Sequence, residues 1–284
     1  MAPVALRANC KVNLSLRITG VLPNGYHTLD SLFLPLPEPY DLLHITPGAK
    51  PGLTLVCSAH ALDARDNTLM RAYTLYAEAN SFAPPLMITL EKGIPVGAGL
   101  GGGSADAAAL LRYLNSKAPK PLDTLTLNAA AARVGADVPF FLQARPCRVR
   151  GIGDAIEPCL PGLAGFWLVL VCPDARVATP WAYAAWDKLH PFASSYDLTK
   201  RDSGTREMDF SFHYLNDLEE AVFPAYPECS RVKCELFRQG AAAAVMSGSG
   251  ASQLGLFRNQ HVARNAAVFF QARGMRTYCH ALTC

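Results

Sequence analysis

A run of glycines between a predicted strand and an alanine-rich segment is the part of the sequence best suited to chemistry. Residues 94 to 105 read Ile-Pro-Val-Gly-Ala-Gly-Leu-Gly-Gly-Gly-Ser-Ala. Three successive glycines can turn their backbone N–H groups inward, because no Cβ is in the way, and so form a concave anion site. The helix predicted to begin at Ser104 adds free N–H donors and the positive end of its dipole. The segment therefore predicts a phosphate-binding loop, since a flexible linker would not run straight into a helix.

The class of phosphate loop follows from what surrounds the glycines. No Gly-Lys-Ser/Thr comes after them, which excludes a Walker A loop. Gly97, Gly99 and Gly102 do satisfy the pattern G-x-G-x-x-G. A dinucleotide-binding fold requires that pattern directly after its first strand, with an acidic residue ending a second strand about 20 residues later. Here strands and a helix precede the loop and another helix follows, so the sequence disfavours an oxidoreductase.

Two charged residues are candidate partners of the loop. Asp137 stands in Gly-Ala-Asp-Val-Pro-Phe-Phe, and Lys11 stands at the head of an otherwise apolar strand. Taken singly, each has a plain alternative: Asp137 could cap a turn and Lys11 could be a solvated edge residue. The residues alone leave both alternatives open.

The elements that must position these residues form two series of strands and helices. Period-two alternation and short apolar runs predict strands over residues 12–18, 42–45, 53–57, 86–91, 166–172, 241–246 and 252–257. Helical spacing and cap signals predict helices over 69–80, 104–114, 125–134, 179–189, 215–222, 229–239 and 262–272. Residues 191–206 are polar and predicted to be a loop. The pattern indicates an α+β protein of two lobes that meet near residue 160.

Composition excludes several classes of protein. The 284 residues are 50% hydrophobic and 17% charged, as in ordinary globular proteins, and the formal charge is only +3. The densest basic stretch has three arginines between Arg145 and Arg150, too few to predict nucleic-acid binding. The most apolar run, 166–172, is much shorter than the roughly 20 residues of a membrane helix. We therefore expect neither nucleic acid nor membrane as a partner.

Cysteine and histidine patterns indicate a reduced protein without its own metal site. The nine cysteines include no C-x-x-C pair and the seven histidines no H-E-x-x-H. The N-terminus lacks a signal-peptide or transit-peptide pattern. We expect a bacterial cytoplasmic enzyme, either a monomer or a homodimer.

Four segments taken together resemble the ordered motifs of the galactokinase, homoserine kinase, mevalonate kinase and phosphomevalonate kinase (GHMP) superfamily. They are residues 11–14, the glycine loop, residues 135–141, and residues 245–251, which read Val-Met-Ser-Gly-Ser-Gly-Ala. They occur in the superfamily's order and span nearly the whole chain. Two further segments, 23–29 (Pro-Asn-Gly-Tyr-His-Thr-Leu) and 216–219 before 226–228, resemble one branch, whose acceptor is methylerythritol linked to cytidine diphosphate.

Small departures separate this chain from the branch. Cys10 precedes the lysine where a small Ala is usual, Val96 and Ala98 replace the more familiar Met and Gly, and Ala105-Asp106 stands where Ser-Asn is common. Ala105 retains a backbone N–H, so the resemblance still implies phosphate binding.

The resemblance implies a fold and a set of roles. It implies an ATP-binding lobe over residues 1–160 that is like ribosomal protein S5, a ferredoxin-like lobe over 161–284, and an active site in the cleft between them. Asp137 would be the base and Lys11 its neighbour, with Mg²⁺ held largely by ATP. The acceptor would be the C2 hydroxyl of the methylerythritol. Asn13, Tyr26, His27 and Thr179 would bind the cytidylyl substrate. ATP would contact Asn67 and Pro95, Val96, Gly97, Ala98, Gly99, Leu100, Gly101, Gly102, Gly103, Ser104 and Ala105.

Two alternatives remain at this point. A kinase for homoserine or mevalonate would not explain Tyr26 and His27, because those acceptors carry no base to stack. A non-catalytic nucleotide-binding protein would require Lys11 and Asp137 to point away from the loop. The sequence also leaves open whether Ser247 to Ser249 contact the acceptor or only brace the second lobe.

Overall fold

The computed structural model of the chain describes residues 3–57, 67–191 and 214–284. Two compact units share the chain, and neither is continuous in sequence. The first unit comprises Met1–Cys10, Pro35–Pro95 and Gly101–Arg145, and the second comprises Lys11–Leu34, Val96–Leu100 and Pro146–Cys284. The division into residues 1–160 and 161–284 stays a prediction. Most of the loop expected over 191–206 lies outside the described residues.

Two long strands run through both units. They are β1 (Val4–Val21) and β2 (His27–Pro47), which pair with each other. The sequence predicted only residues 12–18 of β1 and residues 42–45 near the end of β2. In β1, buried polar residues interrupt the apolar pattern that is expected of a buried strand. In β2, prolines at positions 35, 37 and 39 resemble strand breakers.

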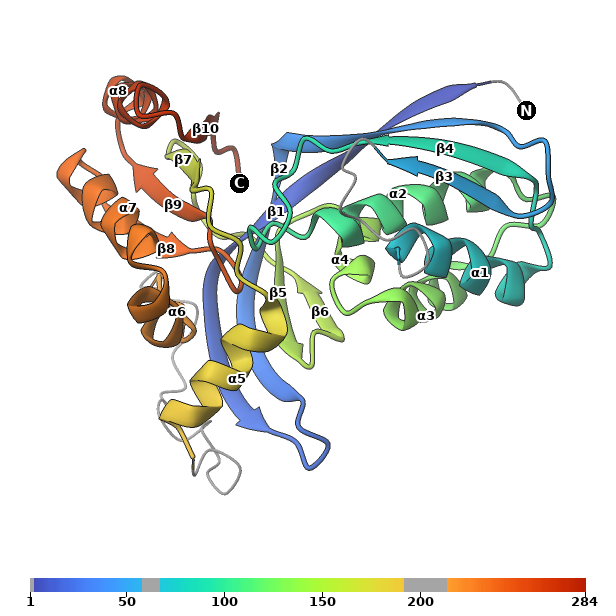
Figure 1. The fold of residues 1–284 in the computed structure, drawn as a ribbon, viewed down its shortest axis with the longest axis horizontal. Helices are drawn as coiled ribbons and strands as arrows, with labels where there is room; N and C mark the ends of the chain where they lie inside the picture. Colours follow the sequence, from blue (N-terminus) through green and yellow to red (C-terminus); the bar gives the residue numbers. More distant parts are fainter. Residues whose placement is uncertain (1–2, 58–66, 192–213) are drawn as a thin grey trace. The chain divides into compact units, whose positions relative to one another are not determined.

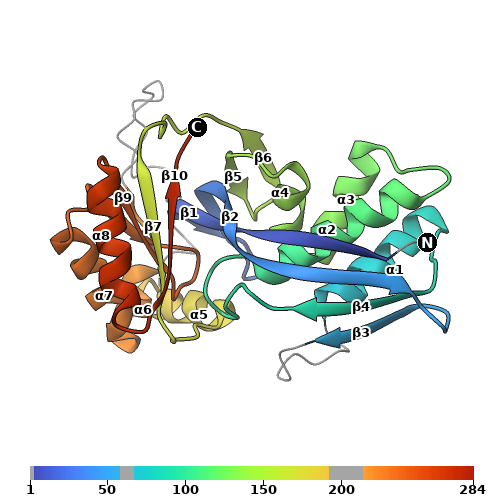
Figure 2. The same ribbon diagram turned by 90° about the horizontal axis from the view of Figure 1, so that it is seen from above.

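The first unit is a small sheet covered by helices. The second half of β2 pairs antiparallel with β4 (Leu86–Glu91), which pairs parallel with β3 (Leu53–Cys57). Figures 1 and 2 show its helices on one face of these strands. They are α1 (Thr68–Asn80), α2 (Gly102–Lys117), α3 (Thr124–Val134) and α4 (Val138–Gln143). Side chains from both layers, such as Ile45, Ile88 and Leu110, are fully buried.

The second unit contains a ferredoxin-like fold. Its antiparallel sheet has the order β10-β7-β9-β8, built from β7 (Trp167–Cys172), β8 (Ala243–Met246), β9 (Gln253–Phe257) and β10 (Arg276–Ala281). The helix α7 (Pro227–Arg238) precedes β8, and α8 (Gln260–Gln271) connects β9 to β10. This β-α-β-β-α-β arrangement confirms the ferredoxin-like expectation. The short strands β5 (Cys147–Gly151) and β6 (Ala155–Pro158) extend from the first half of β2.

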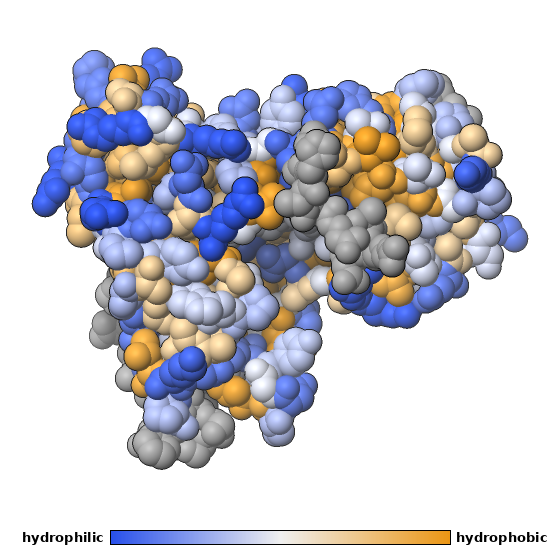
Figure 3. Space-filling model, viewed as in Figure 1, coloured by the Kyte–Doolittle hydropathy of each residue, from blue (hydrophilic) through white to orange (hydrophobic). Residues whose placement is uncertain are grey.

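Helices α7 and α8 pack on one face of the four-stranded sheet (Figures 1 and 2). On α8, Ala263, Ala266, Ala267 and Phe270 fall at helical spacing and are buried against the sheet. The outer sides of these helices carry hydrophilic side chains, which Figure 3 shows in blue at the upper left. The sheet and the two helices thus enclose one core of the second unit.

A second core of this unit involves the later part of β1. Leu16 and Ile18 pack with residues of α5 (Thr179–Leu189) and α6 (Glu219–Ala225). Residues 215–218, predicted as the start of a helix, instead lie along β1: the Leu16 N–H donates to the Leu215 carbonyl at 2.8 Å. The helix begins only at Glu219, so that part of the prediction is wrong. These residues form hydrogen bonds with the backbone of β1 in place of a helical turn.

The other predicted strands and helices are confirmed within a few residues at each end. The sequence did not predict β5, β6, β10 or α4, all of them six residues or shorter. Elements of that length carry little periodicity. No helix in the described ranges is long and apolar enough to cross a membrane.

We expect Phe270→Ala to lower the free energy of unfolding by about 3–5 kcal/mol, because it empties part of a closed core. Phe270 is 1% exposed, whereas Phe237 on α7 is 47% exposed, which makes Phe237→Ala the matched control. Urea denaturation followed by circular dichroism measures both. Equal losses in the two variants would contradict the assigned core.

Candidate active site

The glycine loop owes its shape to alternate glycines. Gly97, Gly99 and Gly101 have φ values of 72°, 74° and 72°, in the left-handed region that other residues avoid. Gly102 and Gly103 are already the first residues of α2. Of the three successive glycines 101–103, only Gly101 has a left-handed conformation, and the anion-binding role of all three stays a prediction. Every second residue turns, which is the αL-αR type of alternation that aims N–H groups at an anion.

The N-terminus of α2 offers unused hydrogen-bond donors. Its N-cap residue is Gly101, and no side chain among the described residues caps it. The first intrahelical bond runs from the Ala105 N–H to the Gly101 carbonyl at 2.9 Å. The N–H groups of Gly102, Gly103 and Ser104 precede that bond and lack helical partners. With the helix dipole, they form a site for negative charge.

Backbone contacts within the second unit fix the first half of the loop. The Lys11 N–H donates to the Leu100 carbonyl at 3.0 Å, and the Val177 N–H donates to the Gly97 carbonyl at 3.2 Å. The Ser247 hydroxyl donates to the Gly99 carbonyl at 2.9 Å. A Cβ on Gly99 would lie 2.0 Å from the Ser247 carbonyl oxygen. Two backbones therefore meet at Gly99 with no room for a side chain.

The Ser-Gly-Ser-Gly segment braces this loop. The sequence had left open whether Ser247 to Ser249 contact the acceptor or have a bracing role. Besides its contact with Gly99, the Ser247 hydroxyl accepts from the Asn13 N–H at 3.1 Å. Asn216 in turn holds the segment, since its side-chain amide donates to the carbonyls of Met246 at 2.8 Å and Gly248 at 2.7 Å. Asn216 is a residue whose role the sequence did not predict, although it stood in one of the quoted motifs.

Lys11 belongs to a buried polar chain between β1 and β2. Its ammonium donates to the Asn13 side-chain carbonyl at 2.6 Å and lies 4.3 Å from the centre of the Phe33 ring. The Asn13 amide donates to the Ser31 hydroxyl at 2.9 Å, which donates to the Ser15 carbonyl. Lys11, Asn13 and Ser31 are all buried. Lys11 is thus not a solvated edge residue.

Asp137 belongs to the first unit and follows, two residues later, a glycine that lies near the start of α2. It is the half-buried residue that precedes α4, and it makes no capping hydrogen bond with its side chain. A Cβ on nearby Gly135 would lie 4.0 Å from the Ser104 hydroxyl. The alternative that Asp137 caps a turn, and its role as the base, both stay predictions.

Asn67 also lies near the start of α2. It is the N-cap of α1, with its side-chain oxygen accepting from the Leu69 N–H at 2.9 Å. The adjacent Thr68 hydroxyl donates to the Gly103 carbonyl at 2.8 Å. The first unit therefore places Asn67 next to the N-terminus of α2, and it also contains Asp137. Lys11 belongs to the other unit, so its pairing with Asp137 stays a prediction.

The hairpin between β1 and β2 presents an exposed aromatic ring. Tyr26 is 61% exposed and so does not pack as a half-buried aromatic residue. His27 is held at its Nε2 by Asp187 of α5 at 2.7 Å, and its ring lies 4.7 Å from that of Tyr183. The second unit thus places a fixed histidine beside a ring that is open to solvent.

Thr179 begins α5 and contacts the bracing segment. Its hydroxyl lies 2.8 Å from the Ser249 hydroxyl. The second unit therefore gathers Thr179, the first half of the glycine loop and the chain that contains Lys11 around the same Ser-Gly-Ser-Gly turn. The tests of their substrate roles remain to be made.

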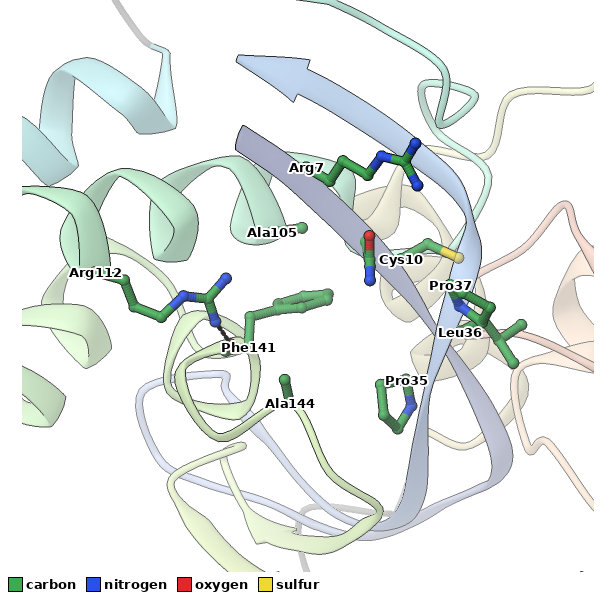
Figure 4. Close-up of a pocket in the computed structure, with 10 residues that line it drawn as sticks. Arg7, Cys10, Pro35, Leu36, Pro37, Ala105, Arg112, Phe141 and Ala144 are labelled. Atoms are coloured by element: carbon green, nitrogen blue, oxygen red, sulfur yellow. Dashed lines mark hydrogen bonds between the residues drawn. The ribbon is translucent and has the colours of Figure 1, made fainter. Parts of the chain in front are cut away.

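A pocket of about 270 Å³ lies within the first unit, between β1, β2, α2 and α4 (Figure 4). Two arginines and no acidic residue line it, and Ala105 is the one lining residue that the sequence had predicted for a site. The Arg112 guanidinium donates to the Phe141 carbonyl at 2.5 Å, drawn as a dashed line in Figure 4. Burial lowers the pKa of Arg112. The pocket is basic with apolar walls.

No group of three or more His, Cys, Asp and Glu side chains that could hold a metal ion occurs in the described parts of the chain.

We expect Gly99→Ala to lower the free energy of unfolding by more than the cost of placing an alanine at a positive φ. Gly274 provides the matched control, because its φ of 77° is nearly the same and a Cβ there meets nothing within 4 Å. Gly274→Ala should cost about 1–2 kcal/mol from backbone strain, and Gly99→Ala clearly more, because the Ser247 carbonyl must move. Chemical denaturation compares the two variants. Equal losses would argue against the tight packing at Gly99.

Comparison with known proteins identifies the family of this fold and loop. The profile of the GHMP kinases N terminal domain matches residues 67–145, and the profile of the GHMP kinases C terminal domain matches residues 199–274. The first match includes the glycine loop, Asn67 and Asp137. The second includes the Ser-Gly-Ser-Gly segment.

Curated relatives cover the chain from end to end. A 4-diphosphocytidyl-2-C-methyl-D-erythritol kinase of Nitratidesulfovibrio vulgaris (strain Hildenborough) is 48% identical over 286 residues, which is 98% of this chain and 99% of the relative. The kinase of the same name from Lawsonia intracellularis is 43% identical, with 98% of this chain and 96% of the relative covered.

Solved structures agree with these relatives. The crystal structure of a 4-(cytidine 5'-diphospho)-2C-methyl-D-erythritol kinase matches with a TM-score of 0.74 and 33% identity, covering 97% of this chain and 98% of that chain. A homoserine kinase from Cytophaga hutchinsonii has a TM-score of 0.70 at 19% identity, covers 99% of this chain and 94% of that chain, and so shares the fold. The chain therefore belongs to the GHMP kinases, in the branch of the 4-diphosphocytidyl-2-C-methyl-D-erythritol kinases, and is an ATP-dependent small-molecule kinase.

Proposed function

We propose that this kinase transfers the γ-phosphoryl group of ATP to the C2 hydroxyl of 4-diphosphocytidyl-2-C-methyl-D-erythritol, a step of non-mevalonate isoprenoid synthesis. The observation that carries the proposal is the 48% identity, over nearly the whole of both chains, to a relative with that name. The exposed Tyr26 beside the fixed His27 supports it independently, because an acceptor without a base would leave this pair unused.

ATP binds, in this proposal, with its phosphates on the glycine loop. The left-handed glycines, the uncapped N-terminus of α2 and the helix dipole supply the donors and the positive potential. The adenine lies beside Asn67, which the contact between Thr68 and Gly103 keeps next to the loop.

Asp137 acts as the base on the acceptor hydroxyl. Phosphoryl transfer passes through a loose transition state, in which alignment and charge neutralisation matter more than early proton removal. An aspartate carboxylate is therefore adequate as the base. Lys11 lies beside it in the proposed complex and stabilises the alkoxide as it forms. The hydrogen bond from Lys11 to Asn13 holds the ammonium in place.

Mg²⁺ accompanies ATP and neutralises charge on its phosphates. The half-buried Asp137 carboxylate and the Ser104 hydroxyl, close to the start of α2, are oxygen donors of the kind that Mg²⁺ accepts. They would supplement the phosphates and water.

The cytidine end of the substrate binds at the hairpin. The Tyr26 ring stacks on the cytosine, as aromatic rings do on unpaired bases, and the His27 Nδ1 meets the edge of the base. Asp187 holds the other ring nitrogen and so fixes the orientation of His27. Asn13 and Thr179 complete the substrate contacts.

The direct test is ADP release from ATP and Mg²⁺ with each of three alcohols. Release with diphosphocytidyl-methylerythritol alone supports the proposal. Release with homoserine or mevalonate instead would retain the kinase and overturn the acceptor. If none of the three alcohols leads to ADP release, the protein is better explained as a non-catalytic nucleotide-binding protein.

We expect Asp137→Asn to lower kcat by on the order of 10²–10⁴-fold, the usual effect of removing a general base. Nucleotide affinity should stay nearly unchanged, because the glycine loop is intact. Steady-state kinetics and calorimetric titration with ADP separate the two effects. Asp123→Asn, at the exposed N-cap of α3, is the control for the same chemical change. Full activity of Asp137→Asn would show that the base is another group.

We expect Tyr26→Ala to raise KM for the cytidylyl substrate on the order of ten-fold or more, since base stacking is worth about 1–3 kcal/mol. Tyr26→Phe keeps the ring and should keep the KM. The KM for ATP should not change in either variant. A phenylalanine variant as poor as the alanine variant would assign the role to the hydroxyl group and not to stacking.

A further inference from the structure

A buried ionic cluster lies directly behind the first residue of α2. The Lys92 ammonium donates to a carboxylate oxygen of Asp41 and, at 3.0 Å, to one of Asp106. Asp41 is 0% exposed and Asp106 2%. A Cβ on Gly102 would lie 3.2 Å from the Lys92 nitrogen and 3.3 Å from the Asp41 oxygen. The cluster is therefore packed against the helix end that receives the phosphates in the proposed function.

The same three residues hold both ends of the glycine loop. Asp41, on β2, accepts from the backbone N–H groups of Gly93 and Ile94, each at 2.8 Å, just before the loop. Asp106 lies in the second turn of α2, just after the loop. Lys92 joins the two carboxylates. At Gly93 there is no room for a side chain, because a Cβ there would lie 2.1 Å from the Tyr40 carbonyl oxygen.

The cluster holds two carboxyl groups and one ammonium in a dry environment. Two ionised carboxylates would leave one unbalanced negative charge, which burial makes costly. Burial raises the pKa of Asp106 to about 7, opposed by Lys92 and assisted by Asp41. The two carboxylates raise the pKa of Lys92 against the effect of burial, so it stays charged. One oxygen of Asp106, Oδ1, is buried without a hydrogen-bond partner among the described residues.

No other described element that packs on α2 brings a charge to this cluster. The charged groups acting on Asp106 are Lys92 and Asp41. Arg133 of α3 pairs with Glu78 of α1 at 3.1 Å, on the exposed surface, and its carbonyl accepts from Arg71. Helix α4 has no charged residue. The net charge of the cluster is therefore set by the proton on its two carboxyl groups.

We propose that Asp41, Lys92 and Asp106 are positioning residues for the nucleotide loop, and that the proton carried by the carboxyl pair sets the affinity of the loop for nucleotide. The proposal rests on the proposed function in one respect, that nucleotide phosphates bind at the start of α2. None of the three residues needs to touch the nucleotide.

The direction of the effect follows from charge. With the proton in place, the cluster is neutral and Asp41 keeps its bonds to Gly93 and Ile94. When Asp106 loses the proton, the cluster carries one negative charge behind a site for phosphate, and the two carboxylates repel each other. Nucleotide affinity therefore falls as the pH rises through the value near 7.

Asp106→Asn tests this directly, because the amide has the shape of the carboxyl group and cannot ionise. Affinity for ADP is measured by calorimetry in wild type and variant from about pH 5.5 to about pH 8.5, a range that brackets the value near 7. The terminal phosphate of ADP titrates in the same range, so the quantity of interest is the ratio of the two Kd values at each pH. The variant should match wild type at the acid end. It should bind on the order of ten-fold more tightly at the alkaline end, the size expected from one charge about 10 Å from an anion.

Asp123→Asn is the matched control, because this exposed N-cap carboxylate lies in the same unit and asparagine caps equally well. The ratio of its Kd for ADP to that of wild type should stay constant over the whole pH range. A constant ratio for Asp106→Asn would overturn the proposal, since a merely structural aspartate would change affinity equally at every pH.

A measurement on the unaltered protein guards against misfolding of the variant. Carbon-13 NMR of protein labelled at the aspartate carboxyl carbons should show one carboxyl group titrating near pH 7, with a midpoint that rises when ADP is bound. A spectrum in which no aspartate titrates above about pH 6 would overturn the proposal.

ADP binding does not depend on the acceptor, so the two proposals can fail separately. A changing ratio without activity on the cytidylyl substrate would support the cluster and overturn the acceptor. Activity on that substrate together with a constant ratio of the two Kd values would support the acceptor and overturn the proposal for the cluster. Absence of ADP binding at every pH would overturn both.

Discussion

The close approach of two backbones at Gly99 is the constraint on which the site depends. A carbonyl of the 247–250 turn occupies the space that any side chain at position 99 would need. The loop can make this contact only with glycines in left-handed conformations at alternate positions. The same contact brings the Ser247 hydroxyl to the loop, and Ser247 also binds the backbone of β1 at Asn13. One packing contact thus couples the loop, the turn and the strand that carries Lys11.

Most of the polar side chains that are buried around this loop form hydrogen bonds with one another. On the β1 side, Lys11, Asn13 and Ser31 form a chain of hydrogen bonds. In the first unit, Lys92 joins Asp41 and Asp106. Buried polar groups without partners destabilise a protein. A buried cluster of two carboxyl groups and one ammonium avoids a net charge when one carboxyl group keeps its proton. Such arrangements weaken the apolar pattern of the strands that contain them, and they are retained where a site needs fixed charge.

Much of the fold could be predicted from local pattern. Helix α2 and strand β7 follow from their alanine-rich and apolar runs, and the βαββαβ order of the second unit agrees with the expectation. The failures have physical causes. Residues 215–218 form hydrogen bonds with the backbone of β1 and not the helical hydrogen bonds that their sequence predicts. The long strand β2 contains four prolines, and α4 is only six residues long.

The sequence by itself determined the family and predicted a phosphate-binding loop and the candidate residues, because glycine spacing and the order of motifs are local properties of the chain. Tertiary structure decided what those residues do to one another. It showed that Ser247 braces the loop, that Tyr26 is exposed, and that His27 is fixed by Asp187, 160 residues away. It also placed Lys92 between two aspartates that are 65 residues apart in the chain. Such pairs carry no local signal, because their energy arises only when burial removes water from groups that are distant in sequence.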